Sequence, residues 1–311
     1  MTIPLFKVIK KGLYTTFQDL GRYGYQQFGV VTSGAMDSYS SQLANILVGN
    51  PREEATLEIT MIGPELRIEG KTLLLAICGA DLSATVNGTP APLWKSFVVQ
   101  KGDVIRFGKP VSGVRAYLAV AGGFHADEVL GSKSFYGKAN LGTEISDGDI
   151  LFGYETANRG RVGLTTYPTF TKDVTIKVII GPHETYFTQK SITHFWTDCF
   201  TVMQGDRMGY RLKGTEPLVH SKKSDIASDA IPLGGIQVPS NGEPIILLAD
   251  RQTTGGYTRI ANVITVDIYK IAQLAPGGTI RFESCDTETA QLLYRKRENY
   301  LKHLQTTLNP Q

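Results

Sequence analysis

Short apolar or alternating runs, each closed by Gly, Pro or Asp, recur along most of this 311-residue chain. The clearest examples are TLEITMIG, LRIEG, LLLAICG, SFVVQKG, VIRFG, VRAYLAVAGG, TIKVIIG, TVMQG, IILLA and TIRFES. Runs of this length, separated by turn residues about every ten positions, are typical of strands in β-sandwiches and β-barrels. The sequence therefore predicts a mainly β fold.

Two segments depart from this pattern and predict helices. Residues 34–48 follow Ser33 and keep apolar side chains at helical spacing as far as Gly49. The C-terminal segment, residues 286–311, places acids early and basic residues late, as the helix dipole favours. We expect helix 34–48 to be the longest helix before the C-terminal one.

The length of the chain exceeds the usual size of one domain. A polar, Gly-containing stretch, residues 155–170, is the best candidate for a linker. The two halves also contain similar short sequences, IGPE at 62–65 and IGPHE at 180–184. We therefore predict two similar β-barrel domains, at 1–155 and 170–285, followed by the C-terminal helix.

Composition restricts the classes of partner. The net charge is only +3, and the Lys and Arg residues are spread along the chain, which does not indicate nucleic-acid binding. Three distant cysteines suggest neither a disulfide framework nor a zinc site. No apolar run is long enough for a membrane span or a signal peptide. We expect a soluble, cytoplasmic protein that binds no metal and no membrane.

The standard sequence motifs for nucleotide and hydrolase sites are absent from the sequence. There is no G-x-x-x-x-G-K-[ST], no strand-linked G-x-G-x-x-G, no H-E-x-x-H and no G-x-S-x-G. A Met-Lys-Met biotin attachment sequence is also missing, so the chain does not carry biotin covalently. These absences favour a subunit that depends on other chains.

A first polar block, residues 17–37, places Arg22, Ser33 and Asp37 around the start of the first helix. A free helix N-terminus attracts anions, so we expect these three residues to bind substrate. In the alternative interpretation, Ser33 is only an N-cap and Asp37 a favourable acid in the first turn.

Two further blocks carry arginines and an amide. Residues 204–214 set Arg207 and Arg211 between glycines, where two guanidinium groups could clamp a carboxylate or phosphate. An ion-pair network of Arg207 with Asp206 would look the same in the sequence. Residues 234–244 place Gln237 on a short strand before a turn, and an ordinary hairpin is the alternative there.

The fourth block begins where the apolar run IILLA ends. It delivers an acid, a guanidinium, an amide and hydroxyls to one place: Asp250, Arg251, Gln252, Thr253, Thr254 and Tyr257. We expect Arg251, Asp250 and Arg207 to be catalytic, and Arg211, Gln237 and the rest of this block to bind substrate. A purely structural pair of Asp250 with Arg251 at the barrel end is the alternative.

Together these blocks resemble the allophanate hydrolase subunit 2 family. The resemblance is carried in order by DLGRYGYQQFGVVTSGAMD, ANILVGN, RAYLAVAGG, LGSKS, GDRMGYRL, PIILLADRQTTGGY and AQLAPGG. The family is also called KipA or the C subunit of prokaryotic 5-oxoprolinase, and it is related to the carboxyltransferase domain of urea carboxylase.

The resemblance implies two tandem cyclophilin-like β-barrel domains with a few helices. It also implies a subunit of an ATP-dependent hydrolase that opens the cyclic amide 5-oxoproline to glutamate. Such a subunit works with a KipI-like B subunit and an A subunit, so we do not expect activity of the chain alone. ATP would be used through the assembly, and homo-oligomerisation stays open.

Two alternatives remain within the resemblance. The chain could be a biotin-dependent carboxyltransferase component of a urea carboxylase-like or allophanate hydrolase-like system, with biotin carried by another chain. It could also be a KipA-type regulatory protein that captures a KipI-like partner. One departure from the family pattern is LGTEISDGDIL at 141–151, which lacks an arginine expected there and puts a substrate contact by that loop in doubt.

Overall fold

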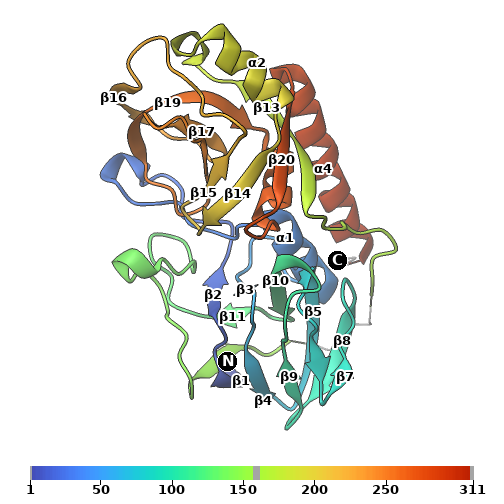
Figure 1. The fold of residues 1–311 in the computed structure, drawn as a ribbon. Coiled ribbons are helices and arrows are strands. Elements are labelled where there is room, and N and C mark those ends of the chain that lie inside the picture. The colour runs from blue at the N-terminus through green and yellow to red at the C-terminus, as the bar shows by residue number, and fades with distance from the viewer. Residues whose placement is uncertain (1, 157–161, 309–311) are drawn as a thin grey trace. The chain divides into compact units, whose positions relative to one another are not determined.

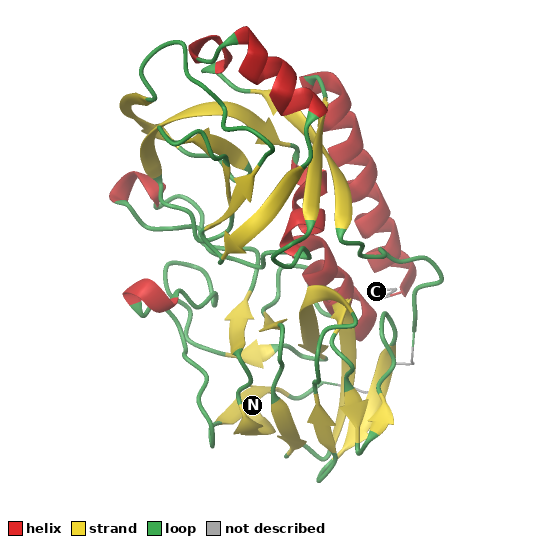
Figure 2. Cartoon of the chain, viewed as in Figure 1, coloured by secondary structure: helices red, strands yellow, loops and turns green. Residues whose placement is uncertain are grey.

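Strands dominate the computed structural model of this chain, which describes residues 2–156 and 162–308 (Figure 1). Figure 2 shows the same dominance of strands, drawn in yellow, over helices. Each apolar run named above contains a strand. The prediction of a mainly β fold is therefore confirmed.

The described residues fall into two compact units. Unit 1 comprises those within Met1–Arg22, Ser33–Phe170 and Asn299–Gln311, and unit 2 comprises Tyr23–Thr32 and Thr171–Glu298. A short N-terminal segment therefore groups with the second half of the chain. The predicted boundaries at 155, 170 and 285 stay predictions.

Unit 1 is built from two antiparallel sheets. Within the described residues, the first has the order β11-β12-β1-β4-β9-β6-β7 and the second the order β2-β3-β10-β5-β8. The strands are β1 Thr2–Lys10, β2 Tyr14–Gln18, β3 Thr56–Thr60, β4 Glu65–Ile68, β5 Thr72–Asp81, β6 Thr85–Val86, β7 Thr89–Pro90, β8 Ser96–Gln100, β9 Val104–Arg106, β10 Ser112–Val120, β11 Phe124–His125 and β12 Ile150–Tyr154.

The second sheet of unit 1 is buried on both faces, which explains the unbroken apolar run in β5. Leu73, Leu75 and Ile77 face the main core, whereas Leu74 and Cys78 face a second core that contains helix α1, Ser38–Val48. Side chains alternate along a strand, so a strand covered on both faces must be apolar at every position. The helix thus closes the open face of the sheet.

Helix α1 ends as predicted and begins later than predicted. Gly49 stops it in the left-handed conformation, with φ of 82°. The N-cap is Asp37, whose side chain accepts a hydrogen bond from the Ser40 amide, so neither Ser33 as N-cap nor Asp37 as a first-turn acid is correct. Ser33 and Gly34 have φ of 55° and 89°, so no helix can run through them.

Unit 2 contains a closed barrel. Its sheet has the order β13-β20-β14-β15-β18-β17-β19-β16, and β13 also pairs with β19, so the ring closes with β16 outside it. The strands are β13 Asp173–Ile180, β14 Phe200–Gly205, β15 Gly209–Lys213, β16 Asp225–Ala230, β17 Gly235–Val238, β18 Ile245–Leu247, β19 Thr254–Val263 and β20 Thr279–Ser284. Strand β19 pairs with β16 through its first residues and with β17 and β13 through its last.

Helices accompany both units. Two that the sequence pattern did not predict are α2, Gln189–Thr197, and α3, Ile268–Ala272. On α2, Phe195 stacks on Phe282 of β20 with ring centroids 4.7 Å apart. The predicted C-terminal helix is α4, Thr287–Leu308, and α1 is the longest helix before it among the described residues.

The predicted linker at 155–170 is partly visible. Residues 157–161 lie outside the described residues. Beyond them, the chain packs onto unit 1, because the Ser96 amide donates to the Val162 carbonyl at 2.8 Å and the Leu164 amide to the Trp94 carbonyl at 2.9 Å. The second part of the stretch is therefore held by backbone pairing.

Candidate functional site

The segment after strand β18 is hydrogen-bonded to the turn between β14 and β15. The Leu248 amide donates to the Met208 carbonyl at 2.9 Å, and the Asp250 amide donates to the Arg207 carbonyl at 2.8 Å. These two bonds extend the pairing beyond the last strand residue, Leu247. They bring the second and fourth polar blocks of the sequence together in unit 2.

Asp250 and Arg207 form a buried, bidentate ion pair. Arg207 Nε donates to Asp250 Oδ2 at 2.9 Å and Arg207 Nη2 to Oδ1 at 3.0 Å, with both side chains at most 7% exposed. The carboxylate of Asp206 instead accepts from the Met208 and Gly209 amides. Two alternatives from the sequence, pairing of Arg207 with Asp206 and of Asp250 with Arg251, are therefore wrong.

Arg251 is buried without a carboxylate to neutralise it. It is 8% exposed, and its guanidinium donates to two backbone carbonyls, from Nε to Ile231 at 3.0 Å and from Nη1 to Leu248 at 3.3 Å. Within residues 2–156 and 162–308, no acid forms an ion pair with it. Burial lowers the pKa of Arg251, and Tyr23 of the same unit acts in the opposite direction.

An uncompensated buried charge is costly, and an anionic ligand would relieve that cost. Arg251 therefore differs in kind from Arg207, whose charge Asp250 already neutralises. Because a guanidinium can bind a carboxylate or a phosphoryl group through its fork of donors, Arg251 is the centre of the candidate site.

Two amide side chains of unit 2 approach the same glycine, Gly255. A Cβ placed on Gly255 would lie 2.9 Å from Gln237 Nε2 and 3.4 Å from Gln252 Nε2. Gln237, on β17, is 3% exposed, and among the described residues its Nε2 makes one long hydrogen bond, of 3.4 Å to the Tyr257 carbonyl. Ile231 Cδ1 lies closer still, at 2.6 Å from that Cβ, so the absence of a side chain at Gly255 is what lets these groups approach the backbone.

The remaining predicted residues of unit 2 lie differently. Arg211 is exposed on β15, so it does not share the buried Asp250 site. Thr254 and Tyr257 are exposed on β19, and the Thr253 carbonyl accepts from the Ile231 amide. The TTGGY sequence is therefore mostly strand, where the sequence suggested a loop.

The predicted residues of unit 1 hold loops and a helix end. Arg22 is 1% exposed, and its Nη2 donates to the Ser134 carbonyl at 2.5 Å and its Nε to the Val129 carbonyl at 3.4 Å. Ser33 is buried, and its hydroxyl has no hydrogen-bond partner within the described residues. Strained backbone and an unsatisfied hydroxyl keep Ser33 a candidate for ligand binding.

The N-terminus of α1 is not a free anion site, contrary to expectation. The Met36 amide donates to Glu58 Oε2 at 2.8 Å, and the Asp37 amide donates to the Tyr117 hydroxyl at 2.7 Å. That hydroxyl donates in turn to Glu58 Oε2 at 2.8 Å. Two carboxylates, Asp37 and the Glu58 that faces Arg115 at 3.9 Å, therefore already occupy the helix start.

Tyr117→Phe should lower the free energy of unfolding by about 1–3 kcal/mol, because it removes one donor to the buried Glu58 and leaves the Asp37 amide without its acceptor. Burial, reinforced by the charge of Glu58, raises the pKa of Tyr117, so the hydroxyl stays a donor at neutral pH. Chemical denaturation measures the effect. An unchanged midpoint would show that the Tyr117 hydroxyl does not contribute to holding the helix start.

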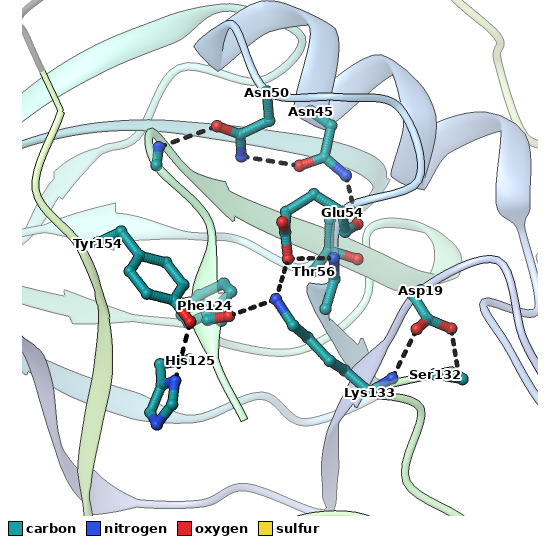
Figure 3. A network of polar contacts seen from close by, with 12 residues as sticks. Asp19, Asn45, Asn50, Glu54, Thr56, Phe124, His125, Ser132, Lys133 and Tyr154 are labelled. Carbon is teal, nitrogen blue, oxygen red and sulfur yellow. Dashed lines mark hydrogen bonds and ion pairs between the residues drawn. The ribbon is translucent and has the colours of Figure 1, made fainter. Parts of the chain in front are cut away.

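A polar network that the sequence pattern did not reveal ties the loops of unit 1 together (Figure 3). Lys133 Nζ donates to Glu54 Oε1 at 2.6 Å and to the Phe124 carbonyl at 2.9 Å. Asp19 accepts from the Lys133 amide and from the hydroxyls of Ser132 and Ser134. Every group in this network has a partner, so its role is to fix the loop that Arg22 also holds.

Residues 28–284 match the family described as carboxyltransferase domain, subdomain A and B. The chain belongs to this carboxyltransferase domain family. The match includes every predicted site residue except Arg22. The resemblance inferred from the sequence blocks is therefore confirmed.

The relatives of this carboxyltransferase domain chain include 5-oxoprolinase C subunits and larger solved proteins. The C subunit of the Haemophilus influenzae 5-oxoprolinase is 35% identical over 298 residues, which cover 93% of this chain and 94% of the relative. The crystal structure of TTHA0988 has a TM-score of 0.83 at 33% identity, and the match covers 91% of this chain and 56% of that one. The K. lactis urea amidolyase has a TM-score of 0.88 at 31% identity, and the match covers 97% of this chain and 20% of the urea amidolyase.

The solved relatives bear on the fold class of this chain and on how much of a longer protein it corresponds to. The TM-score to the urea amidolyase confirms the predicted fold class. This chain spans about half the length of TTHA0988 and a fifth of the urea amidolyase, so both solved chains carry further regions. No helix in the described ranges is both long and apolar enough to cross a membrane.

Proposed function

We propose that this chain is the C subunit of a multi-subunit, ATP-dependent 5-oxoprolinase. The reaction converts 5-oxoproline, ATP and water to glutamate, ADP and phosphate. The family membership and the full-length similarity to the Haemophilus influenzae C subunit support the proposal. The structural observation that carries it is the buried guanidinium of Arg251, which lacks a carboxylate partner in the described part of the chain.

In this reaction the Arg251 guanidinium would stabilise negative charge on the substrate. A lactam is a poor electrophile, and ATP supplies a phosphoryl group that activates its oxygen. Both the activated oxygen and the tetrahedral adduct that water forms carry negative charge, which fixed donors stabilise. Arg251 and the amides of Gln237 and Gln252 are donors of this kind, and Asp250 holds the Arg207 guanidinium in the same unit.

The partners of the chain follow from the same proposal. A KipI-like B subunit and an A subunit would complete the assembly, and ATP would act through it. The letter C in the name of the Haemophilus influenzae relative supports a multi-subunit complex. A cytoplasmic location and any self-association stay predictions.

The similarity to urea amidolyase favours a second candidate function. In a biotin-dependent carboxyltransferase, Arg251 and its amide neighbours would polarise the ureido carbonyl of carboxybiotin carried by another chain. Both reactions need fixed donors for a developing negative charge, so the same residues serve either one. A KipA-type regulatory protein would bind its partner and turn over nothing.

Reconstitution separates the three. We expect the purified chain alone to release no ADP with 5-oxoproline and ATP, and the chain mixed with the A and B subunits to release ADP in a 5-oxoproline-dependent manner. Turnover by the single chain would contradict the proposed dependence on partners. Carboxyl transfer from a biotinylated carrier would establish the second candidate, and tight partner binding without turnover in either assay would establish the third.

A further inference from the structure

Arg259 is a second arginine of unit 2 that lacks a full set of acceptors. It lies on β19, opposite Gln237 of β17 in the sheet register, and its side chain is 16% exposed. Its Nη1 donates to the Ala230 carbonyl at 3.0 Å. The next carbonyl along the chain, that of Ile231, accepts from Arg251. The two arginines therefore hold consecutive carbonyls of one segment.

One edge of the Arg259 guanidinium makes no hydrogen bond within the described residues. Nε is buried and has no hydrogen-bond partner within the described residues. Nη2 lies 3.9 Å from Asp229 Oδ2, beyond hydrogen-bond distance, and the Asp229 side chain is 58% exposed. Nε and Nη2 share the edge through which an arginine donates two parallel hydrogen bonds to a carboxylate.

His183 fixes the backbone from which Arg259 projects. The Arg259 amide donates to His183 Nδ1 at 3.1 Å, so that nitrogen must be unprotonated. Burial and the charge of Arg259 lower the pKa of His183, whereas the charge of Asp229 raises it. A neutral imidazole does not repel a nearby cation, so His183 positions Arg259 without adding to its charge.

We propose that Arg259 is a carboxylate-binding residue of unit 2, and that Asp229 is a weak competitor for its Nε–Nη2 edge. The site takes a small carboxylic acid, which enters this edge and displaces the loose contact with Asp229. Identifying that acid as 5-oxoproline rests on the proposed function. Arg259 would then bind the carboxylate of the substrate, while Arg251 serves the activated ring oxygen.

The test uses His183 as a reporter on the isolated full chain. Its pKa is followed by NMR during titration with 5-oxoproline, with 2-pyrrolidinone, which has the same ring without a carboxylate, and with inorganic phosphate. A carboxylate on Arg259 offsets the positive charge that lowers the pKa of His183, so 5-oxoproline should raise this pKa. 2-Pyrrolidinone should leave it unchanged, and phosphate should act only at higher concentration.

Variants separate the proposal from simple charge effects. Arg259→Gln should weaken 5-oxoproline binding about 10- to 100-fold, the range for hydrogen bonds to a charged group, and Asp229→Asn should strengthen it several-fold. Arg281→Gln, at an exposed arginine of β20, is the matched control and should leave 5-oxoproline binding unchanged. Unchanged binding in Arg259→Gln or in Asp229→Asn would overturn the proposal, as would an equal response to 2-pyrrolidinone or a stronger response to phosphate.

Steady-state kinetics of the reconstituted assembly provide a second test. With the A and B subunits present, Arg259→Lys should raise KM for 5-oxoproline at least about tenfold and leave kcat within about threefold, because a uniform binding contact is weakened. If the isolated chain responds to the carboxylate and the assembly turns over no 5-oxoproline, the proposed function fails and the carboxylate site stands. If the assembly turns over 5-oxoproline and Arg259→Lys lowers kcat alone, the carboxylate site fails and the function stands.

Discussion

Arg251→Ala should lower the 5-oxoproline-dependent turnover of the reconstituted assembly by about two orders of magnitude, the scale seen when one donor to a developing oxyanion is lost. The expectation rests on the buried guanidinium, whose only protein acceptors in the described residues are the carbonyls of Ile231 and Leu248. ADP release at saturating ATP measures the effect.

Stability should respond much less to the same substitution. Arg251→Ala leaves two carbonyls without this donor, but it also removes a buried charge that no acid of the described residues neutralises, and these effects oppose each other. We expect the free energy of unfolding to fall by less than about 2 kcal/mol. Both quantities should be measured on one preparation. Normal turnover combined with a sharply lowered melting temperature would mean that Arg251 only holds the barrel end.

Asp250→Ala should lower the free energy of unfolding by about 3–5 kcal/mol, because it removes the carboxylate that neutralises the buried Arg207 guanidinium and accepts two hydrogen bonds from it. Replacing both partners by apolar residues of similar size, Arg207→Met with Asp250→Leu, should recover most of that loss, since no unpaired charge then remains. Chemical denaturation of Arg207→Met, Asp250→Leu and the double variant measures the coupling between the two side chains.

An exposed ion pair of the same unit supplies the control. Lys190 Nζ lies 2.6 Å from Glu216 Oε2, with side chains 79% and 57% exposed. Water and salt screen such a pair, so Lys190→Ala should leave the unfolding midpoint where it is. If Asp250→Ala were as harmless as Lys190→Ala, the buried pair would not be what fixes the end of β18.

Much of the fold could be predicted because it is encoded locally. The alternating and apolar runs predict the strands, and Gly49 predicts the end of α1, since each depends only on neighbouring residues. The late start of α1 could not be predicted in the same way. Asp37 becomes the N-cap because Tyr117 and Glu58, distant in the sequence, bind the amides before the helix. A carboxylate inside the apolar strand TLEIT was the available signal for Glu58.

The candidate site, like the fold, could be predicted only in part from the sequence. Periodicity and turn residues are sufficient to predict the mainly β class, and the order of the sequence blocks is sufficient to recognise the family. The pairing of Asp250 with Arg207, 43 residues away, and not with its neighbour Arg251 is visible only in the folded barrel. The tertiary structure also introduced Arg259, which no motif marked. The reason is physical: whether a charge is buried and which partner reaches it depend on strands that meet only when the barrel closes.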